Sequence, residues 1–298
     1  MPNADTPGPS LRRLERPGSS TASARSCYPG GPRSRHASPA APSTGGPERD
    51  RYPLAVLLSF VIPAHDEEQC LGATIGAIRA AMGGVDRQYE IIVAADACTD
   101  ATAAIAQAAG ARVVSHERRQ IAATRNLGAR AATGSVLVFV DADTRVTPGA
   151  LAQMLDLVRS GVAGGGGPVR LDGPLPLYVR LMMPVLLAAF RRCRLTGGAF
   201  FFCSREAFDA VGGWDEAYFA GEELVLARAL KKVGRFELVR DPVITSGRKA
   251  RTHSWRDLLG LLLRGVFNPS MVKDRSRLGI FYGARRRDPY PDRTPGEG

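Results

Sequence analysis

The chain has 298 residues and 44% of them are apolar, which is enough for one main domain with a sizeable core and short appendages. Its 40 basic and 29 acidic residues give a formal net charge of +11, which suits a phosphate-bearing ligand or an anionic membrane surface. No zinc-finger spacing, RNP motif or basic-region heptad is present, so we expect no nucleic-acid partner.

The first fifty residues differ from the rest in composition. They contain 9 Pro, 8 Ser and 6 Gly and no run of four apolar residues. Such a segment cannot bury enough surface to offset its chain entropy, so we expect residues 1–52 to be a disordered tail. We expect no signal peptide, because no apolar segment follows the first charges. The five scattered cysteines, without CxxC pairs, also favour the cytoplasm.

Strand and helix patterns alternate from residue 54 onward. Continuous apolar runs predict buried strands, and apolar residues at helical spacing predict helices. The strands are expected at 54–63, 89–95, 111–115 and 136–140, and the helices at 68–82, 99–109, 121–132 and from Pro148, with Thr147 as its cap. This order predicts an α/β fold with a mostly parallel sheet, helices on both faces, and ligands beyond the carboxyl ends of the strands.

The alternation breaks after residue 160. Four glycines, Gly164 to Gly167, indicate a permissive hinge or an irregular strand. An apolar segment of sixteen residues follows at 175–190, which is shorter than the roughly 20 residues that span a membrane. An interfacial helix and a core helix remain as alternatives, and we favour the core. A strand at 199–203 and helices at 205–211 and 222–233 come next, and after about 273 the chain is polar and Arg-rich.

Three acidic clusters lie at the ends of predicted elements. In VFVDADT, Asp141 and Asp143 leave a strand two residues apart, so both carboxylates can face one divalent cation. The alternative is a turn that caps the Pro148 helix. Asp66-Glu67-Glu68 and Asp96 follow the first two strands and can accept hydrogen bonds from a nucleobase and ribose, or cap the helices that follow.

The third cluster is GGWDEAYFAGEEL. Its glycine turn presents Trp214 and Asp215, and Glu222-Glu223 open a helix whose start stabilises carboxylates. A carboxylate near a reacting hydroxyl can act as a general base. The alternative is a pair of solvated acids in a first helical turn.

Together these motifs resemble a known family. VIPAHDEE, IIVAADACTDAT, ATRNLGARAATGSVLVFVDADT and GGAFFFCSREAFDAVGGWDEAYFAGEELVLARAL, in this order, look like the family 2 glycosyltransferases of the GT-A fold. The resemblance covers roughly residues 56 to 250. It departs from the family in the second motif, where the first Asp and the turn glycine of D-D-G-S-T-D are replaced by Ala95 and Ala97.

The resemblance implies roles for individual residues. Asp143 would ligate Mn or Mg, helped by Asp141, which would also touch the ribose-phosphate. Donor-binding residues would be Pro63, Ala64, Glu67, Asp96, Arg125 and Asp141. Glu223 matches the catalytic base, with Glu222 as the alternative, and Gly198, Trp214 and Asp215 would bind substrate.

The sequence therefore predicts an inverting glycosyltransferase that uses a UDP- or GDP-type sugar donor. The proposed division is a GT-A domain at 53–273, with a nucleotide-binding half at 53–146 and an acceptor half at 147–273, and a basic flexible tail at 274–298. The acceptor is not specified, and a lipid-linked acceptor with peripheral contact at the inner face of the membrane is one alternative. A catalytically silent donor-binding protein and a sugar nucleotidyltransferase are the rival functions.

Overall fold

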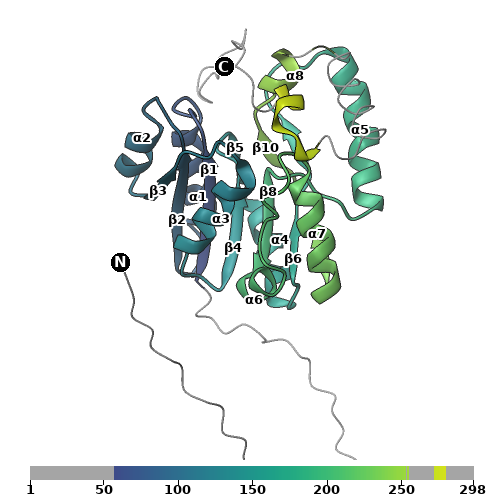
Figure 1. Cartoon of the computed structure of the whole chain (residues 1–298). Helices are drawn as coiled ribbons and strands as arrows, with labels where there is room; N and C mark the ends of the chain where they lie inside the picture. Colours follow the sequence, from purple (N-terminus) through teal and green to yellow (C-terminus); the bar gives the residue numbers. More distant parts are fainter. Residues whose placement is uncertain (1–56, 253, 255–271, 280–298) are drawn as a thin grey trace, which may run out of the picture. The chain divides into compact units, whose positions relative to one another are not determined.

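A computed structural model describes residues 57–252, 254 and 272–279 (Figure 1). These residues belong to one compact unit, Pro47–Gly298. The N-terminal tail predicted at 1–52 lies outside the described residues. Within the tail predicted from 274, the described part contains a 3-10 helix, η2 (Arg275–Arg277), followed by the buried side chain of Leu278.

A mostly parallel sheet forms the centre of this unit. Among the described residues its strand order is β3-β2-β1-β4-β8-β6-β9. Every neighbouring pair is parallel except the two pairs that include β8. The predicted fold class is confirmed. The strands are β1 (Leu58–Ala64), β2 (Tyr89–Asp96), β3 (Arg112–His116), β4 (Val136–Val140), β6 (Gly164–Gly166), β8 (Phe200–Ser204) and β9 (Phe236–Leu238).

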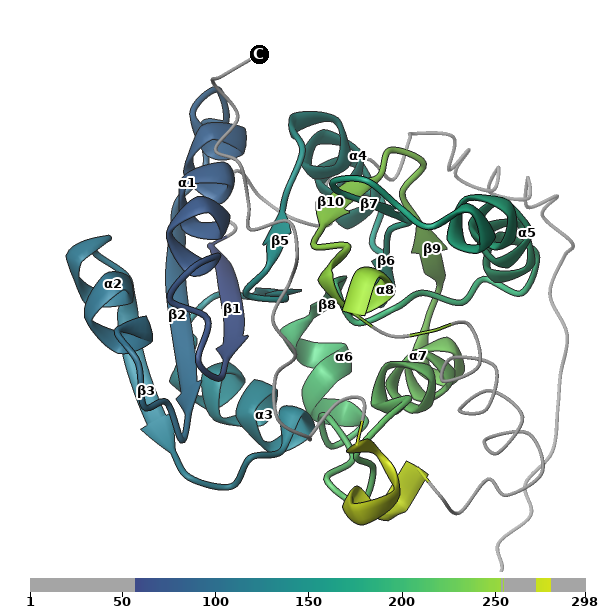
Figure 2. The same cartoon turned by 90° about the horizontal axis from the view of Figure 1, so that it is seen from above.

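Helices cover both faces of the sheet, as the alternation predicted (Figures 1 and 2). Alternate strand residues point to opposite faces, so Phe60 and Ile62 belong to one core and Val61 to the other. The first core receives α1 (Leu71–Met82), α2 (Thr102–Ala108) and α4 (Pro148–Arg159). The second receives α3 (Ile121–Ala131), α6 (Arg205–Ala210) and α7 (Glu222–Val233).

A second, smaller sheet was not predicted. It has the order β5-β10-β7, formed by β5 (Thr144–Arg145), β10 (Val243–Thr245) and β7 (Val169–Leu171). Strand β5 begins directly after Asp143, and α8 (Arg248–Thr252) follows β10. The small sheet therefore brings the segment after residue 240 beside the predicted metal-binding triplet.

Helix α4 begins as its sequence indicates. Thr147 is in an extended conformation, and its Oγ1 accepts a hydrogen bond from the Ala150 backbone N–H at 3.3 Å. Pro148 occupies the first turn, where its missing N–H leaves no bond unmade. The predicted cap is confirmed.

The apolar segment at 175–190 forms α5 (Leu177–Arg192), whose side chains are largely exposed. Val179 is the one buried residue of this helix. Our preference for a core helix is therefore wrong, because periodicity alone cannot tell which surface covers an apolar face. In the described residues no helix is long and apolar enough to cross a membrane.

The glycine run forms strand β6 through close packing. A Cβ on Gly165 would lie 2.1 Å from the Glu237 carbonyl oxygen and 2.4 Å from Cζ of Phe202. Strand β6 thus lies where neighbouring strands leave no room for a side chain. Of the two alternatives, the irregular strand is the one that the structure contains.

We expect Gly165→Ala to lower the free energy of unfolding by about 1–3 kcal/mol, because the added methyl group must displace backbone or Phe202. Urea unfolding followed by circular dichroism measures this. Gly76→Ala in α1 is the matched control, since a Cβ there meets nothing within 4 Å, and it should raise stability by about 0.5–1 kcal/mol. Equal effects of the two substitutions would contradict the packing argument.

Candidate functional site

The candidate acids and the arginines that contact them lie together at one edge of the main sheet. They follow the carboxyl ends of the parallel strands β1, β2 and β4, where ligands of α/β sheets bind. Helix α3 contributes Arg125, and the first turn of α7 contributes Glu222 and Glu223. The site divides into a group around Arg125, a group around Asp143, and the loops after β1 and β2.

Arg125 of α3 joins three parts of the chain. Its guanidinium is 1% exposed. Its Nη1 donates to Oε1 of Glu222 at 2.6 Å, and its Nη2 donates to Oδ1 of Asp141 at 2.9 Å. Burial alone would lower the pKa of Arg125, but Asp141, Glu222 and Glu223 outweigh it and raise that pKa. The arginine therefore stays charged and ties the end of β4 to the start of α7.

Gly198 completes the guanidinium's surroundings. Because β8 runs antiparallel to β4, the residues that precede β8 lie beside those that follow β4, and the Asp141 N–H donates to the Ala199 carbonyl at 3.2 Å. The Gly198 carbonyl accepts from Arg125 Nη2 at 3.2 Å. A Cβ on Gly198 would lie 2.4 Å from that nitrogen, so this position requires glycine.

Trp214 lies underneath the site. It is 2% exposed and packs against Phe139 and Phe201, with ring centroids 5.1 and 5.2 Å apart. The Arg125 guanidinium carbon lies 4.5 Å from the Trp214 ring centre, within cation–π range. Trp214 therefore supports Arg125, and its predicted contact with substrate stays a prediction. Asp215 is exposed, and its carboxylate accepts from the Ala217 N–H at 2.9 Å within the turn.

Asp143 lies among charged groups. Its Oδ1 accepts from Thr245 Oγ1 at 3.3 Å, and its Oδ2 lies 3.9 Å from Arg248 Nη2. Burial first, and then the charge of Glu67, raise the pKa of Asp143 to about 6, although Lys249 and Arg248 oppose this. A half-buried carboxylate that is destabilised by a second carboxylate offers an oxygen ligand to a hard divalent cation. The oxygens of Asp143 and Asp141 are of the chemistry that Mn or Mg takes. Among the described residues, however, the three possible ligands that lie within 4.8 Å of one another are His65, Asp66 and Cys98, so Asp143, Asp141 and Glu67 do not all converge on one point.

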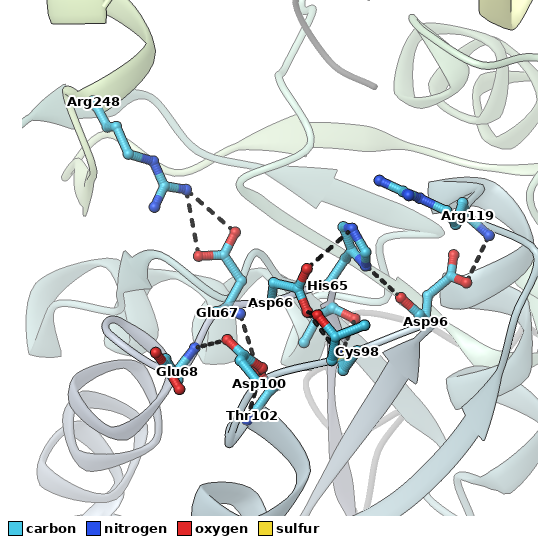
Figure 3. A network of polar contacts seen from close by, with 12 residues as sticks. His65, Asp66, Glu67, Glu68, Asp96, Cys98, Asp100, Thr102, Arg119 and Arg248 are labelled. Carbon is cyan, nitrogen blue, oxygen red and sulfur yellow. Dashed lines mark hydrogen bonds and ion pairs between the residues drawn. The ribbon is translucent and has the colours of Figure 1, made fainter. Parts of the chain in front are cut away.

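Arg248 was not among the predicted site residues. Its Nη2 lies 3.3 Å from both carboxylate oxygens of Glu67 (Figure 3). The sequence signal is the basic run of α8, from Arg248 to Arg251, but its distance of about 100 residues from Asp143 hides the relation. The positive charge of Arg248 can therefore balance the phosphates of a ligand as well as the carboxylates.

Glu223 follows Glu222 in the first turn of α7. Burial first, and then the neighbouring Glu222 carboxylate, raise the pKa of Glu223 to about 8, while Arg125 opposes the shift. Glu222 itself is 4% exposed and is held by Arg125. The two adjacent acids therefore have different environments: one is fixed in an ion pair, and the other holds its proton near neutral pH.

Asp96 caps a helix. Its Oδ1 accepts from the Arg119 N–H at 2.6 Å, and its Oδ2 accepts from the Gln120 N–H at 2.7 Å and from Thr124 Oγ1 at 2.8 Å. The residue is 3% exposed. Asp96 therefore holds the start of α3, and not the start of α2, the next helix along the chain. Its predicted contact with the base and ribose stays a prediction.

The loops after β1 and β2 cross-link through their acids (Figure 3). Asp66 Oδ1 accepts from the Thr99 N–H at 2.7 Å, and Asp100 Oδ2 accepts from the Glu68 N–H at 3.1 Å. Pro63 and Ala64, both buried, end β1 beneath these loops. Ala97 has φ +49°, the left-handed region that glycine adopts freely, at a cost of about 1–2 kcal/mol. The turn thus keeps a glycine-like conformation without glycine.

Comparisons with known proteins agree with this arrangement. The model of glycosyl transferase family 2 matches residues 59–208. Among solved structures, the mannosyltransferase PcManGT from Pyrobaculum calidifontis, in complex with GDP-Man and Mn2+, has a TM-score of 0.55 at 17% identity, with 76% of this chain and 70% of that chain covered.

Two further structures have the same fold. Mannosyl-3-phosphoglycerate synthase from Rubrobacter xylanophilus has a TM-score of 0.53 at 21% identity, with 74% of this chain and 75% of that chain covered. Glucosyl-3-phosphoglycerate synthase from Mycobacterium tuberculosis, in complex with Mn2+, UDP and phosphoglyceric acid, has a TM-score of 0.50 at 22% identity, with 76% and 79% covered. A comparison with curated proteins found no match.

We expect Arg125→Met to lower the free energy of unfolding by about 3–5 kcal/mol, because it leaves the Glu222 carboxylate buried without its partner. Adding Glu222→Gln should restore part of the loss by removing that charge. Urea unfolding of the two single variants and the double variant forms the cycle. Purely additive losses would mean that the two residues are not coupled.

Proposed function

The chain belongs to glycosyl transferase family 2, and we propose that it transfers a sugar from a nucleoside-diphosphate donor to an acceptor hydroxyl with inversion at the anomeric carbon. The observation that carries this proposal is the arrangement around Arg125. One buried guanidinium holds Asp141, at the donor end of the site, and Glu222, next to the candidate base Glu223. The donor side and the acceptor side are thereby fixed relative to one another.

The donor side consists of Asp143, Asp141, Glu67 and Arg248. We assign Asp143 and Asp141 to a divalent cation, Mn or Mg, which two of the compared structures contain as Mn2+. When bound, such a cation neutralises charge on the departing nucleoside diphosphate. Arg248, which pairs with Glu67, is placed to exchange that carboxylate for a phosphate oxygen. The compared structures contain GDP-Man and UDP, which supports a UDP- or GDP-type donor.

On the acceptor side, Glu223 is the proposed general base. Its carboxylate takes the proton of the acceptor hydroxyl while the hydroxyl oxygen attacks the anomeric carbon opposite the departing diphosphate. The new bond forms on the other face of the sugar, so the configuration inverts. Burial and the charge of Glu222, which raise the pKa of Glu223, make it a stronger base than an exposed glutamate. Arg125 keeps Glu222 away from this role by pairing with it.

We assign residues 164–198 to the acceptor side. They lie in the sequence between β4, which precedes the proposed metal ligands, and α7, which carries the proposed base Glu223. They include β7 and α5. We propose the cytoplasm as the compartment, because the four described cysteines, Cys70, Cys98, Cys193 and Cys203, form no disulfide with one another.

Asp143→Ala should abolish Mn-dependent sugar transfer, because it removes the carboxylate assigned to the cation. Transfer and donor hydrolysis are measured with and without Mn over a panel of UDP- and GDP-sugars. Asp156→Ala is the control, since this exposed Asp pairs with Arg159 of the same helix, α4. For the wild type we also expect Mn affinity to fall below about pH 6, because protonation of Asp143 competes with the cation.

Full transfer by Asp143→Ala would contradict the metal assignment. Donor binding by the wild type without transfer or hydrolysis for any sugar would favour the catalytically silent alternative, for which the capped Asp96 and the altered second motif are the supporting features. Formation of a nucleotide-sugar from a nucleoside triphosphate would favour the nucleotidyltransferase.

Glu223→Gln should lower turnover by about 100-fold or more while donor affinity stays within about twofold, because the amide cannot accept the proton. The pKa of Glu223 is raised, so its active, deprotonated form increases with pH, and the wild-type kcat/KM should rise through about pH 8. The Glu223→Gln variant should lack this rise of kcat/KM with pH. Glu206→Gln is the control, because Glu206 is an exposed acid in the first turn of α6. A variant that keeps the wild-type pH profile would exclude Glu223 as the base.

A further inference from the structure

Helix α5 carries a large exposed apolar surface. Five of its apolar residues are exposed: Leu177 68%, Leu181 67%, Met182 52%, Val185 72% and Leu186 45%. Single exposed apolar residues are common, but five on one helix form a continuous surface of the kind that marks an interaction site. Helix α5 therefore exposes apolar side chains on the outside of the domain.

The spacing of these residues places them on one side of the helix. At 100° per residue, Leu177, Leu181 and Val185 fall within about 80° of one another, and Met182 and Leu186 extend the same side. Val179 and Met183 lie on another side of the helix and are less exposed. Apolar residues therefore occupy both the packed side and the exposed side of α5, and its charged residues are arginines.

The surface is also positively charged at its C-terminal end. No Asp or Glu occurs between Asp172 and Glu206, whereas α5 ends in Arg191 and Arg192 and Arg194 follows. Helix α7 adds further basic groups here, since Lys231 Nζ donates to the Arg194 carbonyl at 2.8 Å. Among these arginines Arg194 is paired with an acid, Glu237, at 3.6 Å.

We propose that the exposed face of α5 docks in the interfacial layer of an anionic phospholipid bilayer. The apolar residues would enter the boundary of the acyl chains, and the arginines at the end of the helix would meet the phosphate groups. Charge complementarity selects this occupant over a second copy of the chain. In a two-fold dimer through this face, the same segment of the second copy would offer no Asp or Glu to meet these arginines.

Docking on α5 also has a defined relation to the site. Near the start of the helix, Tyr178 Oη donates to the Ala250 carbonyl at 3.1 Å. Ala250 belongs to α8, which carries Arg248 and its pair with Glu67. A membrane bound to α5 would thus lie beside the segment that borders the donor group. The proposal itself does not depend on sugar transfer, because it concerns lipid binding by the folded chain.

The test is cosedimentation of the full chain with vesicles, without any donor. Vesicles of equal parts phosphatidylglycerol and phosphatidylcholine should bind the protein, and vesicles of phosphatidylcholine alone should bind it more weakly. Leu181→Asp with Val185→Asp should weaken binding to the anionic vesicles by about tenfold or more, because two carboxylates replace apolar contacts. Arg191→Ser with Arg192→Ser should weaken it by roughly fivefold per arginine.

The matched control is Ala104→Asp with Gln107→Asp, which adds the same two charges on the exposed side of α2 and should bind as the wild type does. All four positions in the two aspartate variants are exposed, and circular dichroism verifies that each variant is folded. The proposal is overturned if the wild type does not bind anionic vesicles, or if the α5 variant binds as tightly as the control. A wild-type dimer that only the α5 aspartates dissociate, with no vesicle binding, would identify a second copy as the occupant.

Discussion

The buried guanidinium of Arg125 is the interaction on which the rest of the site depends. It comes from α3, pairs with a carboxylate at the end of β4 and another at the start of α7, and rests on the Trp214 ring. Such a buried ion pair contributes little net stability, because desolvation offsets most of its attraction. Its physical effect is geometric: a planar, fixed donor group holds the two carboxylates at set positions.

This arrangement divides the acids of the site into separate roles. Asp141 and Glu222 are neutralised by one arginine, while Asp143 and Glu67 share the more distant Arg248. Asp143 is left with an excess of negative charge around it, which favours a cation. Glu223 is left half-buried beside another carboxylate, which favours a proton. The proposed metal ligands and the proposed base can therefore lie in one acidic region without having equivalent roles.

Helix α5 shows a different constraint on the same chain. A surface helix of a domain normally turns its apolar side to the core, yet here the sheet already has its two covers, α1, α2 and α4 on one face and α3, α6 and α7 on the other. The described core has no open face for α5 to cover. Its apolar residues therefore lie outward, where only an environment outside the domain can bury them.

The sequence by itself determined the features that depend on neighbouring residues. Continuous apolar runs located β1 and β4, helical spacing located α3 and α7, and Thr147 with Pro148 marked the start of α4, because these signals are local. The order of the acidic motifs indicated the family.

Only the tertiary structure decided that β8 runs antiparallel and brings Gly198 to Arg125, that Asp96 holds the start of α3, and that Trp214 lies beneath the site. It also decided that Arg248 reaches Glu67 and that α5 is exposed. Long-range packing decides the direction of a strand, the pairing of residues a hundred positions apart, and the surface that covers an apolar face. Local periodicity contains no information about that packing.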